Sequence, residues 1–283
     1  MQLKFSIITP SYNMLNYLKL CHASVVSQTG VSVEHIVVDG GSTDGTVEWL
    51  KYQKGIKWIS ELDNGMYDAL NKGFEMASGN IIGHLNADEQ YLPNTLKNIY
   101  NYYISNNNTD IIFGDTIIID KSGNYICSKK SYYANKWFLL SSHLYFLTST
   151  MFFKRKIIDE GNRYNINFKN IGDIEFVVRL FDKKYKFNHI KEYFALFTIT
   201  GKNLSYDNSA KIEWSTLIKK YKFIQFFKIP LNLVRIIIKI LSFGYYDKTP
   251  LVYDVFISEN EKSTQKVTKT NYKWPSAIGS ISE

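Results

Sequence analysis

Acidic and amide side chains occur at three places in this chain where they could hold a charged or hydroxyl-rich ligand. Asp39 ends one apolar run, residues 86–89 (NADE) follow a second apolar run, and Asp173 precedes an amphipathic stretch. Hard divalent cations prefer carboxylate oxygens as ligands, and a carboxylate can also take a proton from a hydroxyl group. These residue types therefore predict a site that binds a divalent cation or a hydroxyl-bearing ligand and performs acid–base chemistry.

The elements that must position these groups alternate along the first 120 residues. Short apolar runs predict strands at 5–9, 35–39, 56–60, 81–85 and 110–114, with helical stretches between them. One such stretch places Tyr67, Leu70, Phe74 and Ala77 on a single apolar stripe. This alternation predicts an α/β fold with a mostly parallel sheet flanked by helices. Ligands of such sheets bind beyond the carboxyl ends of the strands, where residues 39 and 86–89 fall.

The regular alternation ends after residue 115. A hairpin is expected over 116–128, a strand over 150–154, a helix over 172–181 and a strand over 192–198. Beyond residue 205 the composition changes, which predicts two units: a catalytic domain over 1–205 and a C-terminal helical, basic amphipathic extension and tail over 206–283. The polar last 25 residues are expected to be poorly ordered.

The C-terminal extension carries most of the net charge of +8, because residues 201–283 contain 13 basic and 7 acidic residues. Pro230 is expected to divide it into two helices. In the second, Leu231, Val234, Ile238 and Leu241 share one face, and Arg235 and Lys239 lie beside it. This pattern is typical of a helix that lies on a membrane surface, and equally of a helix packed on the domain with a solvated basic rim.

Composition excludes several classes of protein. A 45% hydrophobic and 21% charged chain is not disordered as a whole, and two cysteines, Cys21 and Cys127, cannot form a disulfide scaffold. No signal-peptide pattern and no run of about 18 uncharged apolar residues is present. We therefore expect a cytoplasmic protein, peripheral on the inner face of the cytoplasmic membrane. The basic extension has no nucleic-acid recognition motif, so no nucleic-acid partner is expected.

Three segments in a fixed order resemble a known family: residues 6–13 (SIITPSYN), 37–46 (VVDGGSTDGT) and 85–89 (LNADE). With residues 60–79 (SELDNGMYDALNKGFEMASG) and 172–176 (GDIEF), they resemble the family 2 glycosyltransferases of the bacterial surface-polysaccharide type. The resemblance extends over about residues 3–200. It implies the Rossmann-like GT-A fold and inverting transfer of a sugar from a nucleotide-diphospho-sugar.

The resemblance assigns donor-binding roles to the loops after the strands. Asp39 would read a uracil-type base, although an aspartate here could simply cap the following turn. A dinucleotide site is excluded, because the first loop lacks the G-x-G-x-x-G pattern. Asp68 could equally form a surface ion pair with Lys72, four residues on. The residues expected to contact the donor are Thr9, Pro10, Tyr12, Asn13, Asp39, Asp68, Asn71, Asn86 and Ala87.

Residues 86–89 match the position of the family's acidic metal motif. Asp88 and Glu89 are the predicted ligands of a divalent cation, Mn²⁺ or Mg²⁺, that would offset charge on the departing nucleotide diphosphate. Asn86 stands where the family often has an acid, and Glu89 where it often has an aspartate. We expect activity to survive these differences with weaker metal binding.

Asp173 is the predicted catalytic base, which removes the proton from the acceptor hydroxyl. Glu175 is the neighbouring candidate, but Arg179 lies four residues on and is expected to pair with it. The resemblance also favours Asp173. A position at the start of a helix opposes this role, because the helix dipole lowers a carboxyl pKa, whereas burial would raise it.

These inferences predict a metal-dependent glycosyltransferase. It would use a nucleotide-sugar donor of the UDP-sugar class and a saccharide acceptor, plausibly linked to undecaprenyl diphosphate, in capsule, O-antigen or exopolysaccharide synthesis. Two alternatives remain open. A nucleotidyltransferase would need a glycine-rich basic loop after the first strand, which residues 14–19 match poorly. A non-catalytic nucleotide-sugar-binding scaffold is favoured by the altered acidic motif.

Overall fold

The computed structural model describes residues 3–141, 144, 146–201, 209–221, 223–242 and 249–273. It confirms the strand–helix alternation expected for the first 120 residues. The elements of this half are β1 (Lys4–Ser11), α1 (Leu15–Val26), β2 (Ser32–Asp39), α2 (Thr46–Tyr52), β3 (Ile56–Ser60), α3 (Met66–Met76), β4 (Ile81–His84), β5 (Glu89–Tyr91), α4 (Thr95–Ser105) and β6 (Ile111–Ile119).

The second half of the chain contains shorter helices and additional strands. The hairpin expected over 116–128 forms between β6 and β7. The elements of this half are β7 (Tyr125–Lys129), α5 (Lys136–Ser141), η1 (Thr148–Thr150), β8 (Met151–Lys154), α6 (Lys156–Asp159), α7 (Gly172–Asp182), β9 (Phe187–Thr198), α8 (Ser209–Lys219), α9 (Ile224–Leu241), β10 (Leu251–Ser258) and β11 (Glu261–Val267).

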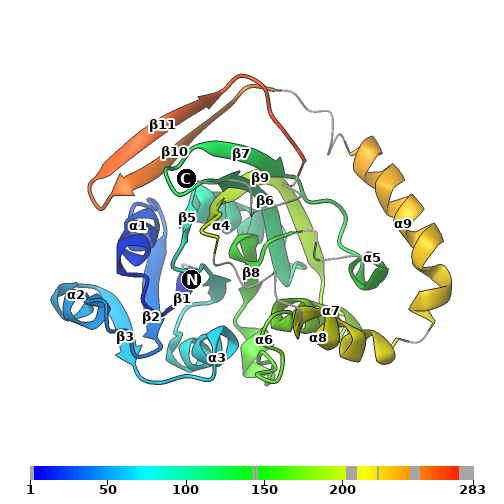
Figure 1. The fold of residues 1–283 in the computed structure, drawn as a ribbon, viewed down its shortest axis with the longest axis horizontal. Coiled ribbons are helices and arrows are strands. Elements are labelled where there is room, and N and C mark those ends of the chain that lie inside the picture. The colour runs from blue at the N-terminus through cyan, green and yellow to red at the C-terminus, as the bar shows by residue number, and fades with distance from the viewer. Residues whose placement is uncertain are drawn as a thin grey trace.

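One mixed sheet forms the centre of the molecule (Figure 1). Its strand order is β3-β2-β1-β4-β8-β6-β9-β5, and β7 pairs with β6. Most strands run in one direction, whereas β5, β7 and β8 run against their neighbours. The register pairs Ser11 with Asp39 and Asp39 with Ser60, so β1, β2 and β3 end at the same edge. The residues that end or follow these strands, Asn13 and Asp39 among them, therefore lie at this edge.

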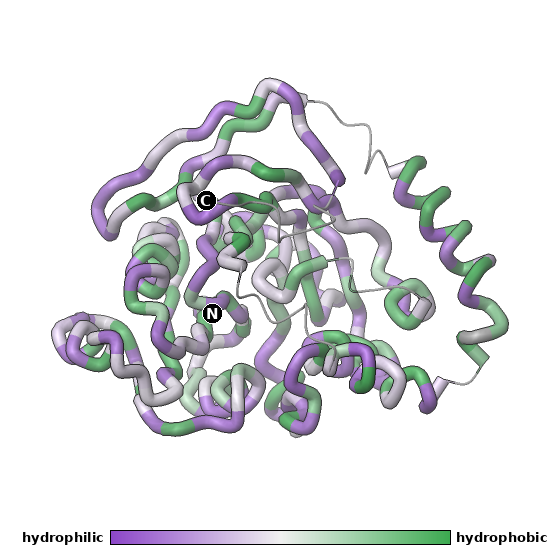
Figure 2. The backbone as a smooth tube through the Cα atoms, viewed as in Figure 1, coloured by the Kyte–Doolittle hydropathy of each residue, from purple (hydrophilic) through white to green (hydrophobic). Residues whose placement is uncertain are grey.

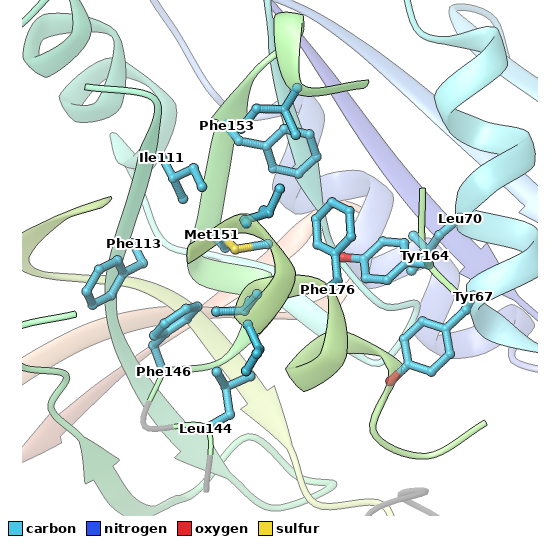
Figure 3. Close-up of a cluster of buried hydrophobic side chains, with 14 of the residues drawn as sticks. Tyr67, Leu70, Ile111, Phe113, Leu144, Phe146, Met151, Phe153, Tyr164 and Phe176 are labelled. Carbon is cyan, nitrogen blue, oxygen red and sulfur yellow. The ribbon is translucent and has the colours of Figure 1, made fainter. Parts of the chain in front are cut away.

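A large buried cluster holds α3 and α7 against the sheet (Figure 3). The predicted stripe on α3 faces this cluster, and its members Tyr67, Leu70, Phe74 and Ala77 are all buried. The ring of Phe176 on α7 lies 4.4 Å from the ring of Tyr164 and 6.5 Å from that of Phe74, between centroids. Burial of this many aromatic side chains fixes α7, and with it Asp173, relative to α3.

The C-terminal extension contains two helices, but Pro230 does not divide them as expected. Helix α8 ends at Lys219, α9 begins at Ile224, and α9 continues through Pro230. A proline inside a helix removes one backbone hydrogen bond and disfavours the helix without excluding it. The boundary expected at residue 205 lies outside the described residues. Of the last 25 residues, expected to be poorly ordered, residues 259–273 are described and include β11, and residues 274–283 lie outside the described residues.

The tail also contains a hairpin that the sequence analysis did not predict. Strands β10 and β11 pair in antiparallel fashion and lie across β7 and α1 (Figure 1). Tyr253 and Val255 of β10 are buried against Leu92 and Ile117, and the Tyr253 hydroxyl donates to the Gly123 carbonyl at 2.9 Å. The apolar run over 251–257, interrupted only by Asp254, was the available signal. The polar strand β11 is held by pairing with β10, which packs on the sheet.

Candidate functional site

Asp39, at the end of β2, is wholly buried and holds the following turn. Its carboxylate accepts hydrogen bonds from the backbone N–H groups of Gly41 and Ser42 at 3.1 and 2.9 Å. The hydroxyls of Ser42 and Ser60 donate to it at 2.5 and 2.6 Å. These four bonds correspond to the turn-capping role, so Asp39 fixes the shape of the loop between β2 and α2.

The loop after β1 is braced against the same turn. The Asn13 side-chain oxygen accepts the Thr43 N–H at 2.8 Å, and the Asn13 N–H donates to the Ser42 hydroxyl at 2.7 Å. Tyr12, in contrast, is 62% exposed. Pro10 is buried within β1, and the Thr9 hydroxyl is buried against His35 at 2.9 Å. Only Tyr12 of this set thus presents a large exposed side chain.

Gly40 lies close to the side chains of Tyr12 and Asp63. A Cβ atom placed on Gly40 would lie 2.8 Å from Asp63 Oδ2 and 3.4 Å from the Tyr12 ring, so a larger residue would displace them. An exposed ring can stack on a nucleobase, and a carboxylate can accept a base N–H. The sequence analysis treated Asp63 only as part of a turn. Its proximity to Gly40 depends on the pairing of β2 with β3.

Asp68 and Asn71 of α3 are both engaged in contacts within the protein. Asp68 accepts the Asn64 N–H at 2.9 Å and lies 3.9 Å from the Lys72 ammonium, as the ion-pair alternative anticipated. The Asn71 amide donates to the Tyr164 carbonyl at 2.9 Å and accepts the Tyr164 N–H at 2.8 Å. Asn71 therefore positions the segment that contains Tyr164.

Residues 86–89 connect β4 to β5 at the site edge of the sheet. Asn86 bonds to His84 Nε2 at 2.8 Å, and its N–H donates to Glu89 Oε2 at 2.8 Å. Ala87 is buried in the cluster under α1 and α2. Glu89 is the first residue of β5 and only 2% exposed, so its carboxylate serves the turn. Asp88 is more accessible than Glu89.

Burial perturbs both carboxyls of this turn. Desolvation raises the pKa of Asp88 to about 6. Desolvation, and then the nearby Asp88 charge, raises the pKa of Glu89 to about 8. A cation beside these groups would stabilise their ionised forms. Among the described residues, no group of three or more histidine, cysteine or acidic side chains could hold a metal ion. Mg²⁺ commonly binds through one or two carboxylates plus substrate phosphates, and Asp88 fits that mode.

Asp173 lies at the start of α7 and is fixed by two donors. The Ile174 N–H donates to its Oδ1 at 2.8 Å, and the Tyr67 hydroxyl donates to the same oxygen at 3.2 Å. Burial raises the pKa of Asp173, and these two bonds oppose the shift. The effect of burial on the pKa of Asp173 is therefore larger than the opposing effect of the helix N-terminus. Gly172 permits this geometry, because a Cβ there would lie 2.6 Å from the Tyr67 ring.

A series of contacts joins Asp173 to the β4–β5 turn. Tyr67 stacks on Tyr164 with ring centroids 5.2 Å apart, and Tyr164 lies edge-on to His84 at 6.4 Å. His84 in turn bonds to Asn86. Tyr67 entered the sequence analysis only as a member of an apolar stripe. Its hydroxyl acquires a role once α7 is packed beside α3 (Figure 3).

Glu175 forms the ion pair expected from its spacing. Its two carboxylate oxygens accept from Arg179 Nε and one terminal nitrogen at 3.0 and 3.1 Å. Glu175 is also buried. A buried carboxylate in a bidentate pair is a poor proton acceptor, so of the two acids on this helix turn Asp173 is better suited to act as a base.

Comparisons with solved structures support the fold. S. aureus TarS in complex with UDP-GlcNAc superposes with a TM-score of 0.59 and 17% sequence identity, over 76% of this chain and 64% of that chain. The mannosyltransferase PcManGT from Pyrobaculum calidifontis, in complex with GDP-Man and Mn²⁺, gives a TM-score of 0.54 and 16% identity, over 72% of this chain and 59% of that chain. The arrangement of sheet and helices is therefore that of the GT-A fold.

Sequence comparisons identify the family. A PGL/p-HBAD biosynthesis glycosyltransferase from Mycobacterium bovis is 29% identical over 189 residues, which cover 62% of this chain and 69% of that protein. The model of the family described as glycosyl transferase family 2 matches residues 6–161, more than half of the chain. This match contains the β1 loop, the Asp39 turn and residues 86–89. The protein is a glycosyltransferase that belongs to family 2.

Proposed function

We propose that this protein transfers a sugar, with inversion at the anomeric carbon, from a UDP-sugar to a hydroxyl of a saccharide acceptor. The observation that carries this proposal is the partly buried Asp173 carboxylate, which is held by Tyr67 and connected through Tyr164 to the β4–β5 turn. Burial raises the pKa of Asp173, which makes the group a stronger base than a surface aspartate. A raised pKa in such a site is typical of a catalytic acid or base.

The donor would lie across the carboxyl ends of β1, β2 and β4. Tyr12 and Asp63 flank Gly40 and could stack on and hydrogen-bond to the base, while Asp39 keeps their loops in place. TarS has been crystallised with UDP-GlcNAc and PcManGT with GDP-Man, so proteins of this fold bind different nucleotides. The Asp63 carboxylate near Gly40 can accept the N–H of a uracil-type base, and the choice of UDP over GDP rests on the resemblance of the sequence motifs.

Asp88 would hold a divalent cation, Mn²⁺ or Mg²⁺, with the donor diphosphate. When bound, this ion would act as a Lewis acid on the leaving phosphate oxygens. Glu89 would support it indirectly, because its carboxylate accepts the Asn86 N–H and so fixes the turn. Asn86 could reach the ribose or the diphosphate as a neutral donor.

Asp173 would take the acceptor proton while the acceptor oxygen attacks the anomeric carbon. The bond between that carbon and the diphosphate oxygen breaks, and its electron pair leaves with the nucleoside diphosphate. The new bond forms on the opposite face, so configuration inverts. Tyr67 holds the carboxylate through the hydrogen bond to Oδ1, and the buried aromatic rings around Tyr164 limit access of water.

Calorimetric titration of UDP, with GDP and CDP as controls, tests the donor. We expect UDP to bind more tightly than GDP or CDP. We also expect Mn²⁺ to strengthen UDP binding, because Asp88 alone supplies little of the coordination shell and the diphosphate of UDP would supply further ligands. NMR of the purified product measures its anomeric configuration, and a configuration opposite to that of the donor would establish inversion. A preference for GDP would contradict the proposed donor, and retained configuration would contradict the mechanism.

A second candidate is a nucleotide-sugar-binding scaffold without catalysis. Two features favour it. The Glu89 carboxylate accepts the backbone N–H of Asn86, so it serves the turn. Asn86 itself stands where the family often has an acid. This function predicts UDP binding that Mn²⁺ does not strengthen, with neither transfer nor donor hydrolysis. The titration above, followed by a hydrolysis assay with UDP-sugars, separates it from the enzyme.

We also propose that α9 holds the enzyme on the inner face of the cytoplasmic membrane. Phe226, Ile229 and Leu241 are 82%, 75% and 72% exposed. Arg235 and Lys239 are half-buried on the same helix. Figure 2 shows α9 as a largely hydrophobic helix at one side of the molecule. A helix that faces only water would expose its charged side chains and bury its apolar ones. In the described part of the chain, no helix meets the length and hydropathy needed to cross a bilayer.

The double variant Phe226→Ser/Ile237→Ser is expected to reduce binding to phosphatidylglycerol vesicles by about tenfold or more, because burial of each side chain contributes about 1.5–3 kcal/mol. Sedimentation with vesicles measures the bound fraction. The matched control is Val26→Ser/Tyr52→Ser, which removes exposed apolar groups from α1 and α2. Equal binding by the α9 variant and the wild type would exclude α9 as the membrane contact.

A saccharide acceptor on undecaprenyl diphosphate fits an enzyme at this surface. Such acceptors carry the growing chain in synthesis of capsule, O-antigen or exopolysaccharide, which is the role we propose. The mycobacterial relative is named as a glycosyltransferase of PGL/p-HBAD biosynthesis.

A further inference from the structure

Helix α8 of the C-terminal extension holds the loop that leads into α7 (Figure 1). The Glu213 carboxylate accepts the backbone N–H of Lys169 at 2.9 Å on Oε1, and those of Asn170 and Ile171 at 3.0 and 3.1 Å on Oε2. The Asn170 side-chain amide donates to Glu213 Oε1 at 3.1 Å and to the Ser209 hydroxyl at 2.8 Å. One carboxylate thus receives four hydrogen bonds from three consecutive residues. Hydrogen bonds to an ionised carboxylate are among the stronger ones in proteins, so α8 fixes this loop.

Packing of α8 keeps Glu213 in place against the loop. Leu217, four residues on, is 1% exposed and belongs to the large buried cluster that holds α3 and α7. Trp214 packs against the same cluster. Residues four apart share one face of a helix, so burial of Leu217 turns Glu213 toward the rest of the molecule. Desolvation acts to raise the pKa of Glu213, but the hydrogen bonds from the loop outweigh it and the pKa is lowered, so the carboxylate stays charged at neutral pH.

The loop held by Glu213 leads directly to the proposed base. Ile171 immediately precedes α7, and Asp173 is the second residue of that helix. The other side of the loop is tied to the turn after β3, because the Lys169 ammonium donates to the Asn64 carbonyl. A displacement of the loop would therefore move the start of α7 relative to the strand ends where the donor would lie. The hydrogen bond from the Tyr67 hydroxyl to Asp173 would be disturbed as well.

We propose that Glu213 is a positioning residue for the base Asp173, so that the C-terminal extension forms part of the active site. This assignment rests on the proposed transferase function and adds a residue outside 6–161, the part of the chain that matches the family model. Glu213 does not touch the reacting atoms. It acts through residues 169–171, which keep Asp173 in its partly buried position at the start of α7. A displacement of about 1 Å can lower a catalytic rate about a hundredfold, so this support matters for the reaction.

Glu213→Gln in the full chain tests the proposal, because it keeps the size of the side chain and removes its charge. Whichever way the new amide is turned, its nitrogen would face at least one backbone N–H of the loop. We expect kcat to fall about tenfold or more, whereas KM for the UDP-sugar and UDP affinity by calorimetry stay unchanged. The matched control is Glu192→Gln, at an exposed carboxylate of β9 that accepts the Asn98 amide at 2.6 Å, and it should keep the wild-type kcat. Equal kcat values for Glu213→Gln and the wild type would overturn the proposal.

The pH profile of the same variant separates positioning from a contribution to folding alone. Desolvation is the main cause of the raised pKa of Asp173, so a looser start of α7 would admit water and lower that pKa. The base must be ionised to act, so the acidic limb of kcat/KM should move to lower pH in Glu213→Gln. Tyr67, Tyr164 and Lys129, which also influence Asp173 electrostatically, are unchanged in this variant. An acidic limb that stays at the wild-type pH would mean that Glu213 serves folding alone, and the proposal would be wrong.

Hydrogen exchange of residues 169–174 provides a readout that needs no transfer activity. Exchange should be faster in Glu213→Gln than in the wild type, because the loop N–H groups lose their acceptor. Unchanged exchange would refute the support by α8. Faster exchange in the variant, with no transfer by the wild type, would refute the proposed function and leave the support by α8 established. If thermal unfolding shows that Glu213→Gln does not fold, Ser209→Ala removes only the bond to Asn170 and should move the acidic limb in the same direction by less.

Discussion

Replacement of Asp173 with asparagine is expected to reduce sugar transfer by about 10²- to 10⁴-fold, the usual contribution of a general base. Asparagine keeps the size and polarity of the side chain but cannot accept the acceptor proton. UDP affinity should be unchanged, because the donor contacts lie at the strand ends. The measurement is kcat/KM with a UDP-sugar and a model acceptor, together with UDP binding by calorimetry.

The matched control is Asp182→Asn, an identical substitution at the last residue of α7. Asp182 is partly exposed and pairs with Lys136 and the Tyr221 hydroxyl on the surface. We expect transfer by this variant to stay close to the wild-type rate. If Asp173→Asn keeps transfer within about tenfold of the wild type, then Asp173 is not the base.

The pH profile provides an independent test of the same residue. Burial raises the pKa of Asp173, and the base must be ionised, so kcat/KM should fall as the pH drops through this raised pKa. The Tyr67 hydroxyl stabilises the carboxylate and lowers that pKa. Tyr67→Phe should therefore move the acidic limb to higher pH. A loss of rate with no displacement of the limb would indicate a structural role for Tyr67 alone.

Replacement of Asp88 with asparagine is expected to abolish the effect of Mn²⁺ on UDP binding and to lower transfer by at least about a hundredfold. The metal-independent part of the affinity for UDP should persist, because Tyr12 and Asp63 lie in the loops after β1 and β3, away from Asp88. Desolvation raises the pKa of Asp88 to about 6. Metal binding requires the ionised carboxylate, so in the wild type the Mn²⁺ effect should weaken below about pH 6.

Asp159→Asn is the control for this second prediction. Asp159 ends α6, and its carboxylate lies 3.3 Å from Arg155 in an exposed ion pair, which contributes little to stability. The Mn²⁺ dependence of UDP binding should be unaltered in this variant. Unchanged Mn²⁺ dependence in Asp88→Asn as well would show that another group holds the metal or that none is used.

Local sequence determined most of the parallel half of the fold. The strands β1, β2 and β4 are almost wholly buried because both faces of the sheet are covered, and their apolar runs are visible without a structure. The Glu175–Arg179 pair and the apolar stripe on α3 follow from helical spacing alone. The motifs at residues 6–13, 37–46 and 85–89 were sufficient to indicate the family, which the comparisons confirm.

Contacts between distant segments decided the rest. Sequence spacing could not show that Tyr67 reaches Asp173, 106 residues away, or that Asp63 lies beside Gly40. The orientation of α9 and the β10–β11 hairpin likewise depend on what each packs against, because amphipathic patterns do not specify the partner surface. Burial, which raises the pKa of Asp173 and Asp88, is a property of the assembled core. The residue types that could do chemistry were thus set by sequence, whereas their environment, and hence their acidity, was set by tertiary packing.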